Sequence, residues 1–84
     1  MRQIAARWNW DKKCYNDCSV PELATKYTEN LESIIQCANC EKHIKAGDTY
    51  TSKEIHDLVG FGYLVCPACY NLELEREQQA REKK

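Results

Sequence analysis

The sequence predicts a single small domain of the α+β class. Three observations lead to this prediction: residues 4–11 alternate between apolar and polar side chains, two β-prone runs at 49–55 and 61–65 lie close together, and the chain from residue 67 onward favours a helix. A chain of 84 residues buries only a marginal core. We therefore expect a cross-link to hold these elements together.

The cysteines supply a candidate for that cross-link. Two Cys-x-x-Cys pairs, Cys37/Cys40 and Cys66/Cys69, are separated by 25 residues. Two thiolates in each of two tight turns can surround one zinc ion, and four sulfur ligands leave no open position for water or substrate. The spacing therefore predicts one structural Zn²⁺. A disulfide or a redox dithiol at the second pair is the alternative.

The first element in chain order is a strand. The alternation over residues 4–11 is typical of a half-buried strand, with Trp8 and Trp10 on the same side. The two indoles suit either the core of a small domain or, together with Arg7 and Lys12, a surface that contacts a partner.

A helix is predicted next. The polar residues 12–18 are expected to form a turn, after which Ser19 and Glu22 form a capping box with Pro21 in the first helical turn. The helix should cover residues 21–34. Its apolar stripe, at helical spacing, comprises Leu23, Tyr27, Leu31 and Ile34.

The remaining elements are a hairpin and a second helix. Residues 49–55 and 61–65 are predicted to pair, with their turn inside 57–60. The helix should begin at Pro67. Its distal end, residues 75–84, has almost no apolar side chains, so we expect it to project into solvent unless a partner covers it.

We expect one zinc-binding domain over residues 1–84, made of an extension at 1–36, a finger at 37–75 and a polar helix end at 76–84. The net charge of −1 argues against a partner held mainly by phosphate attraction. No apolar run is long enough to span a membrane and the first residues do not resemble a secretory signal, which predicts a cytoplasmic protein with no membrane partner.

The turn that carries Cys37 and Cys40 is hereafter called the knuckle. The order of knuckle, hairpin and helix resembles a treble-clef zinc finger over residues 37–75. The run Cys37-x-x-Cys40-x-x-x-Ile44-x-x-Gly47-x-x-Tyr50 is similar to that of many small bacterial and phage zinc proteins. The resemblance implies a small zinc-stabilised treble clef with an N-terminal strand and helix. It assigns no single activity, because such fingers serve as ribosomal proteins, nuclease scaffolds, anti-sigma factors and docking modules.

Three narrower resemblances bear on function. Residues 55–58 and 61–71 resemble parts of HNH-type nucleases, which implies a divalent ion at His56 and Asp57, although the His/Asp order is reversed. The predicted helix, four-cysteine finger and polar helix are similar to DksA/TraR-type proteins, which enter RNA polymerase. Small treble-clef anti-sigma factors of bacilli are similar in size and finger plan.

Four further side chains are potential metal ligands. A second site of two thiolates and two imidazoles would use Cys14, Cys18, His43 and His56. The alternative is that these are buried small groups or surface bystanders.

Together these observations favour a non-enzymatic, zinc-stabilised protein-binding module. We expect it to act as an adaptor or inhibitor of a larger host machine such as RNA polymerase or a sigma factor. A nucleic-acid-binding finger and a divergent HNH-type nuclease are the alternatives.

Overall fold

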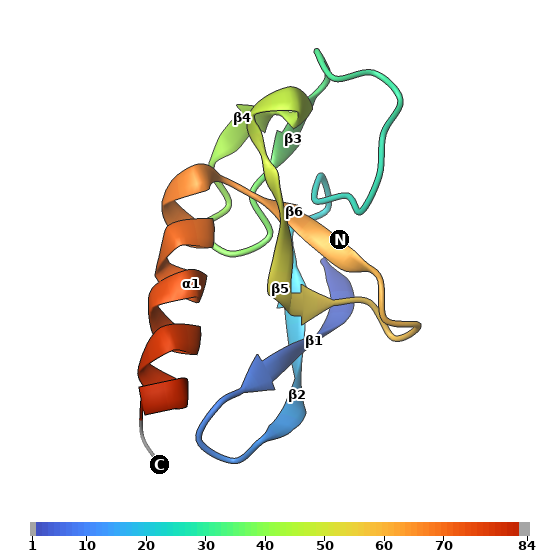
Figure 1. Ribbon diagram of the computed structural model, residues 1–84. Coiled ribbons are helices and arrows are strands. Elements are labelled where there is room, and N and C mark those ends of the chain that lie inside the picture. Colours follow the sequence, from blue (N-terminus) through green and yellow to red (C-terminus); the bar gives the residue numbers. More distant parts are fainter. Residues whose placement is uncertain (1, 83–84) are drawn as a thin grey trace.

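The fold consists of two antiparallel sheets and one long helix (Figure 1). The computed structural model describes residues 2–82. The main sheet has the strand order β2-β1-β5-β6, and β3 pairs with β4 in a second sheet. The elements in chain order are β1 (Gln3–Asn9), β2 (Cys14–Val20), β3 (Ile34–Gln36), β4 (His43–Lys45), the 3₁₀ turn η1 (Ala46–Asp48), β5 (Tyr50–His56), β6 (Gly62–Val65) and α1 (Pro67–Glu82). The predicted α+β class is confirmed.

The N-terminal strand is confirmed as β1, but the predicted turn at residues 12–18 is wrong. Most of that stretch belongs to β2, which pairs residue by residue with β1 along its whole length. The hairpin closes where Lys13 N–H donates to Asn9 O at 2.8 Å. The polar composition was misleading because β2 lies at the edge of the sheet, where residues 14–17 are exposed.

The predicted helix at residues 21–34 is also wrong. The segment forms an irregular loop, and its backbone carbonyls bond to other elements: Thr25 O accepts from Leu64 N–H at 2.9 Å, and Leu31 O accepts from Gly47 N–H at 2.9 Å. Since helix propensity is a weak preference, these long-range bonds decide the conformation. The predicted apolar stripe is half or more exposed at all four positions, namely Leu23, Tyr27, Leu31 and Ile34.

The hydrophobic core is small, and cysteines form part of it. Along β1, Ala5 is fully buried, whereas its neighbour Ile4 is 66% exposed. Trp8 lies on the Ile4 side of β1, so it stays outside the core. The buried cluster comprises Ala5, Val20, Ala24, Cys37, Ala38, Ile55, Tyr63, Val65, Cys66 and Cys69.

The predicted hairpin and C-terminal helix are confirmed as β5, β6 and α1. The Asp57 carboxylate shapes the hairpin turn, because it accepts backbone N–H groups of Val59, Gly60 and Phe61 at 2.7–2.9 Å. α1 lies alongside β5 (Figure 1).

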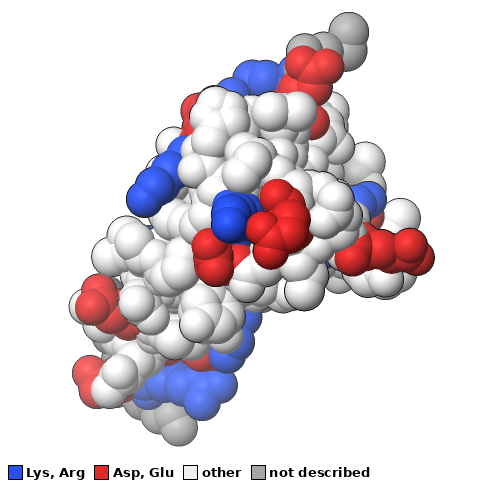
Figure 2. All heavy atoms as spheres, turned by 90° about the horizontal axis from the view of Figure 1, so that it is seen from above, with Lys and Arg blue, Asp and Glu red and all other residues white. Residues whose placement is uncertain are grey.

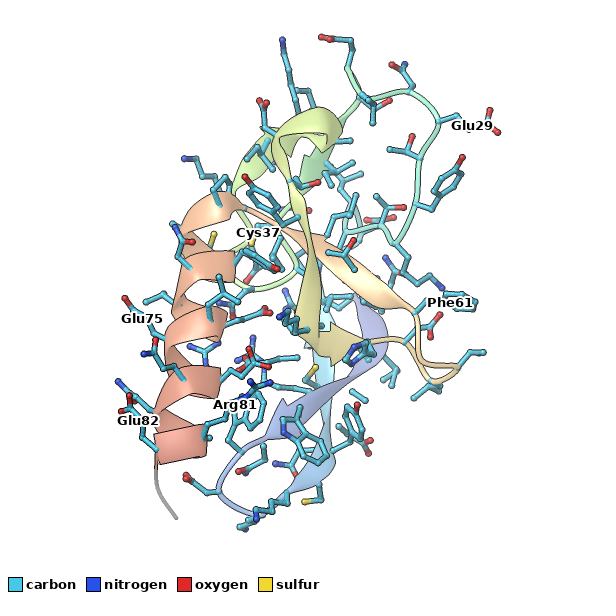
Figure 3. The ribbon with its side chains drawn as sticks, viewed as in Figure 1. Glu29, Cys37, Phe61, Glu75, Arg81 and Glu82 are labelled. Atoms are coloured by element: carbon cyan, nitrogen blue, oxygen red, sulfur yellow. The ribbon has the colours of Figure 1, made fainter. Side chains whose placement is uncertain are left out.

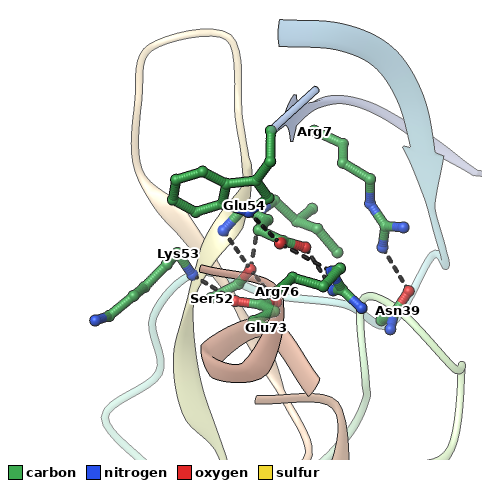
Figure 4. Close-up of polar contacts among 9 residues, drawn as sticks. Arg7, Asn39, Ser52, Lys53, Glu54, Glu73 and Arg76 are labelled. Carbon is green, nitrogen blue, oxygen red and sulfur yellow. Dashed lines mark hydrogen bonds and ion pairs between the residues drawn. The ribbon is translucent and has the colours of Figure 1, made fainter. Parts of the chain in front are cut away.

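Helix α1 docks on β5 largely through polar side chains (Figure 4). Glu73 is 2% exposed and accepts from Ser52 Oγ at 2.6 Å and from Lys53 N–H at 2.8 Å. Further along, Arg76 contacts Glu54, and Glu77 lies 3.6 Å from Lys53 Nζ. The predicted solvent-facing end of the helix is therefore held against the sheet at Arg76 and Glu77.

Candidate metal centre

The four cysteines of the two Cys-x-x-Cys pairs come together. The Sγ atoms of Cys37, Cys40, Cys66 and Cys69 all lie within 4.8 Å of one another. The Sγ atoms of Cys40 and Cys66 are 3.7 Å apart, and all four thiols are free. A tetrahedron with metal–sulfur bonds of about 2.3 Å has edges of about 3.8 Å. The sulfur arrangement therefore fits one metal ion.

Local backbone structure places the first pair. The β3–β4 strands hold a tight turn, in which Cys37 N–H donates to Lys42 O at 2.8 Å and Glu41 N–H donates to Cys37 O at 3.0 Å. Glu41 has a φ of 67°, which lets the chain reverse after Cys40.

The second pair lies where β6 passes into α1. Cys66 follows the last residue of β6, and Cys69 lies in the first turn of the helix. Tyr70 N–H donates to Cys66 O at 3.0 Å, so helical hydrogen bonding begins at the ligand pair. Figure 3 shows Cys37 beside this first turn of α1.

Backbone hydrogen bonds stabilise the thiolate form of Cys37. Burial raises its pKa, but backbone N–H groups of Cys40, Cys66 and Asn39 donate to its Sγ at 3.3–3.4 Å and bring the pKa down to about 7. Burial raises the pKa of Cys69 and that of Cys40. Because metal ions bind the thiolate, the lowered pKa suits Cys37 to a role as a ligand.

Arg7 and Asn39 connect the knuckle to the main sheet. The Arg7 guanidinium donates to Asn39 Oδ1 (Figure 4), and the Asn39 side chain also bonds Cys69. Such outer contacts orient metal ligands. Arg7, predicted as a partner contact, thus has an internal role, and Asn39 was missed because nothing local marks it.

The structure does not assemble the predicted second metal site. Among residues 2–82, the four cysteines Cys37, Cys40, Cys66 and Cys69 are the only three or more potential ligands close enough to share one metal ion. Cys14 and Cys18 lie four residues apart on β2, which separates them by about 13 Å. They cannot bind the same ion, and His43 and His56 lie on β4 and β5.

Asp57 and His56 are engaged in the hairpin. The Asp57 carboxylate bonds Lys26 Nζ at 2.7 Å and three backbone N–H groups, and these bonds, Lys26 first, hold its pKa well below the usual range. His56 packs its ring against Tyr15, with centroids 5.7 Å apart, and its Nδ1 is buried without a hydrogen-bond partner. Asp57 therefore stabilises the hairpin turn.

The two tryptophans form a half-buried aromatic cluster. The Trp8 ring lies 4.9 Å from Tyr15 and 6.1 Å from Trp10, and Trp10 Nε1 donates to Glu54 at 2.8 Å. Lys12, the other predicted contact residue, is exposed in the adjoining turn. Both indoles are thus used in folding while retaining some exposed surface.

The hairpin turn carries an apolar surface that the sequence analysis missed. Leu58, Val59 and Phe61, hereafter the apolar tip, are 73%, 80% and 64% exposed. Figure 3 shows Phe61 at the outer end of the hairpin, pointing away from the molecule. The occurrence of three large apolar residues in so short a turn could have predicted this surface from the sequence.

No protein family, curated protein or solved structure matches this chain. Within the part of the chain that the structure describes, no helix is long and apolar enough to cross a membrane.

Proposed function

We propose that this protein is a non-enzymatic binding module of the treble-clef type, stabilised by one zinc ion. The observation that carries the proposal is the four-thiol cluster, in which Cys37, Cys66 and Cys69 belong to the hydrophobic core and Cys40 is exposed. Zinc suits four cysteine ligands in a tetrahedron, and a site closed by four sulfurs is structural. The turn between β3 and β4 carries Cys37 and Cys40, and the β5–β6 hairpin leads to Cys66 and to Cys69 in the first turn of α1. This order of knuckle, hairpin and helix supports the treble-clef proposal.

The metal would tie the hairpin to the helix and so present the apolar tip in one conformation. Asp57 already fixes the turn through its three backbone bonds and its ion pair with Lys26. A preorganised apolar surface binds at a lower entropic cost than a mobile one. Exposed apolar groups of this kind favour a protein partner.

The charge distribution supports a protein partner over nucleic acid. Within the described residues 2–82, six basic side chains form ion pairs: Arg2, Lys26, Lys45, Lys53, Arg76 and Arg81. On the face drawn in Figure 2, both signs of charge are interspersed between broad uncharged areas. A nucleic-acid footprint needs a basic face. The resemblance to anti-sigma factors and DksA/TraR-type proteins makes RNA polymerase and its sigma factor the first partners to test.

The test is a binding assay with purified RNA polymerase and with nuclease-treated lysate. We expect wild type to carry one zinc per chain and to capture a stoichiometric protein, and Phe61→Ser to retain zinc but lose capture. Ile4→Ser, which alters an equally exposed apolar residue on β1, is the matched control and should capture normally. Absence of zinc from the purified protein would refute the proposed metal centre. Equal capture of the partner by Phe61→Ser and Ile4→Ser would refute the proposal that the apolar tip binds it.

A further inference from the structure

Strand β2 forms an open edge of the main sheet (Figure 1). Its seven residues pair without interruption to β1, and residues 14–17 are exposed. Proteins usually protect such edges with proline, lysine, a bulge or a covering segment. β2 contains no proline or lysine, its single charged side chain is Asp17, and its register with β1 is unbroken. The edge is therefore free to pair with another strand.

The two cysteines of β2 lie symmetrically about Asn16, two residues away on each side: Cys14-Tyr15-Asn16-Asp17-Cys18. We propose that β2 pairs antiparallel with β2 of a second copy of this chain, centred on Asn16. In that register Cys14 lies opposite the partner's Cys18, and Asn16 lies opposite the partner's Asn16.

Charge disfavours the register centred on the neighbouring residue Asp17, and a contact at Ser19 limits the length of the pairing. Shifting the centre to Asp17 would place two carboxylates directly opposite each other, and like charges opposite one another destabilise a strand pair. Centring on Asn16 instead places Tyr15 opposite the partner's Asp17. The pairing ends before Ser19, whose carbonyl already accepts Arg2 Nη2 at 3.2 Å.

The two cysteines report on the register. Opposite residues of an antiparallel pair have Cα atoms about 4.5–5.5 Å apart, within the range of about 4.4–6.8 Å that a disulfide spans. Within one chain Cys14 and Cys18 are about 13 Å apart and cannot be bridged. A disulfide between these two positions must therefore join two chains.

Oxidised glutathione can form this bond by exchange. A cysteine thiolate attacks the glutathione disulfide and releases one glutathione thiolate. The partner's cysteine thiolate then attacks the mixed disulfide at the protein sulfur and releases the second. The protons of the two cysteines end on the two released glutathione thiolates, so each protein disulfide costs one oxidised glutathione.

The first experiment measures association of zinc-loaded protein by sedimentation velocity under reducing conditions. We expect wild type to shift from monomer to dimer as concentration rises. Asn16→Lys, which would place two ammonium groups opposite each other, should remain monomeric, and the neutral Asn16→Thr should still dimerise. A wild type that stays monomeric, or an Asn16→Lys variant that dimerises normally, would overturn the proposal.

The second experiment tests the register with oxidised glutathione and a non-reducing gel. Wild type should form a covalent dimer whose linked peptides join Cys14 to Cys18, and either Cys14→Ser or Cys18→Ser should abolish it. A dimer that survives in one of these single variants would show that identical positions are linked, and the register would be wrong.

Discussion

Arg76 of α1 binds Glu54 of β5 through two hydrogen bonds, from Nη2 at 2.6 Å and from Nε at 3.0 Å (Figure 4). The Glu54 side chain is 3% exposed, and Trp10 Nε1 donates a third bond to it at 2.8 Å. One buried carboxylate thus links the helix, the central sheet and the end of the N-terminal hairpin.

Replacing Arg76 should destabilise the fold substantially. In Arg76→Ala the Glu54 carboxylate would remain buried with Trp10 as its remaining side-chain donor, and breaking a buried ion pair from one side is costly. Because the Arg76 side chain is 40% exposed, water can replace part of the lost interaction. We expect the free energy of unfolding to fall by about 1–3 kcal/mol, measured by urea denaturation of zinc-loaded protein.

The matched control for this experiment is Arg81→Ala. Arg81 also lies on α1 and pairs with Glu77, but its side chain is 76% exposed. An exposed pair of this kind contributes about 0.5 kcal/mol or less. Equal losses in the two variants would contradict a special role for the Arg76–Glu54 pair.

The same pair predicts a dependence of stability on pH. Burial raises the pKa of Glu54, but the hydrogen bonds from Arg76 and Trp10 outweigh it and leave the pKa below its usual value. A lowered folded pKa stabilises the protein above the unfolded pKa of about 4.3, and this contribution is lost as pH falls through the folded value. Wild type should therefore exceed Glu54→Gln in stability at pH 7, and the difference should shrink below about pH 4.

Comparing the two proteins at each pH removes effects common to both, including loss of metal in acid. Glu75→Gln, on the outer side of α1 (Figure 3), is the control and should differ little from wild type at any pH. A constant difference between wild type and Glu54→Gln from pH 7 to 3 would contradict the prediction.

The features predicted from the sequence are those with local causes. The Cys-x-x-Cys spacing places two sulfurs on one turn. The β-prone runs on either side of Asp57 form a hairpin, and the Asp57 carboxylate accepts backbone N–H groups of the hairpin turn. Helix-favouring composition after Pro67 likewise predicts α1. In each case neighbouring residues determine the structure.

The features that sequence reasoning missed depend on distant contacts. In the loop before β3 the apolar residues have helical spacing. The loop is nevertheless not helical, because Leu31 O accepts a hydrogen bond from Gly47 N–H, which lies beyond the knuckle in the sequence. β2 reads as a polar turn, but β1 pairs with it throughout. The sequence of α1 shows no apolar face for docking, because the helix docks through Glu73 on Ser52, which lies 21 residues away in the chain. Nothing within a short window of sequence signals these pairings.

The four cysteines should not contribute equally to zinc binding. Cys37→Ala would leave the backbone N–H groups of Asn39, Cys40 and Cys66 without their sulfur acceptor, whereas Cys40 Sγ takes one backbone bond, from Lys42. Unpaired buried donors are costly. We expect Cys37→Ala to bind zinc about tenfold or more weakly than Cys40→Ala. The zinc affinity of each variant is measured by competition with a chromophoric chelator. Equal affinities would show that the sulfur-directed bonds are unimportant.

Gly62 begins β6 at the point where its register with β5 is irregular. A Cβ atom there would lie 2.6 Å from Ser52 O and 2.8 Å from Thr51 Cγ2. Gly62→Ala should therefore push β6 away from β5 and displace the chain that leads to Cys66. We expect the free energy of unfolding to fall by about 1–3 kcal/mol, with weaker zinc binding in the same chelator assay.

A second variant identifies which contact is responsible. Thr51→Ser removes the Cγ2 atom but leaves the Ser52 carbonyl, which is the closer of the two and belongs to the backbone. The double variant Thr51→Ser/Gly62→Ala should recover only a minor part of the lost stability, because the backbone contact persists. Full recovery would assign the strain to the threonine methyl group, and a Gly62→Ala protein as stable as wild type would show that β5 and β6 do not approach so closely.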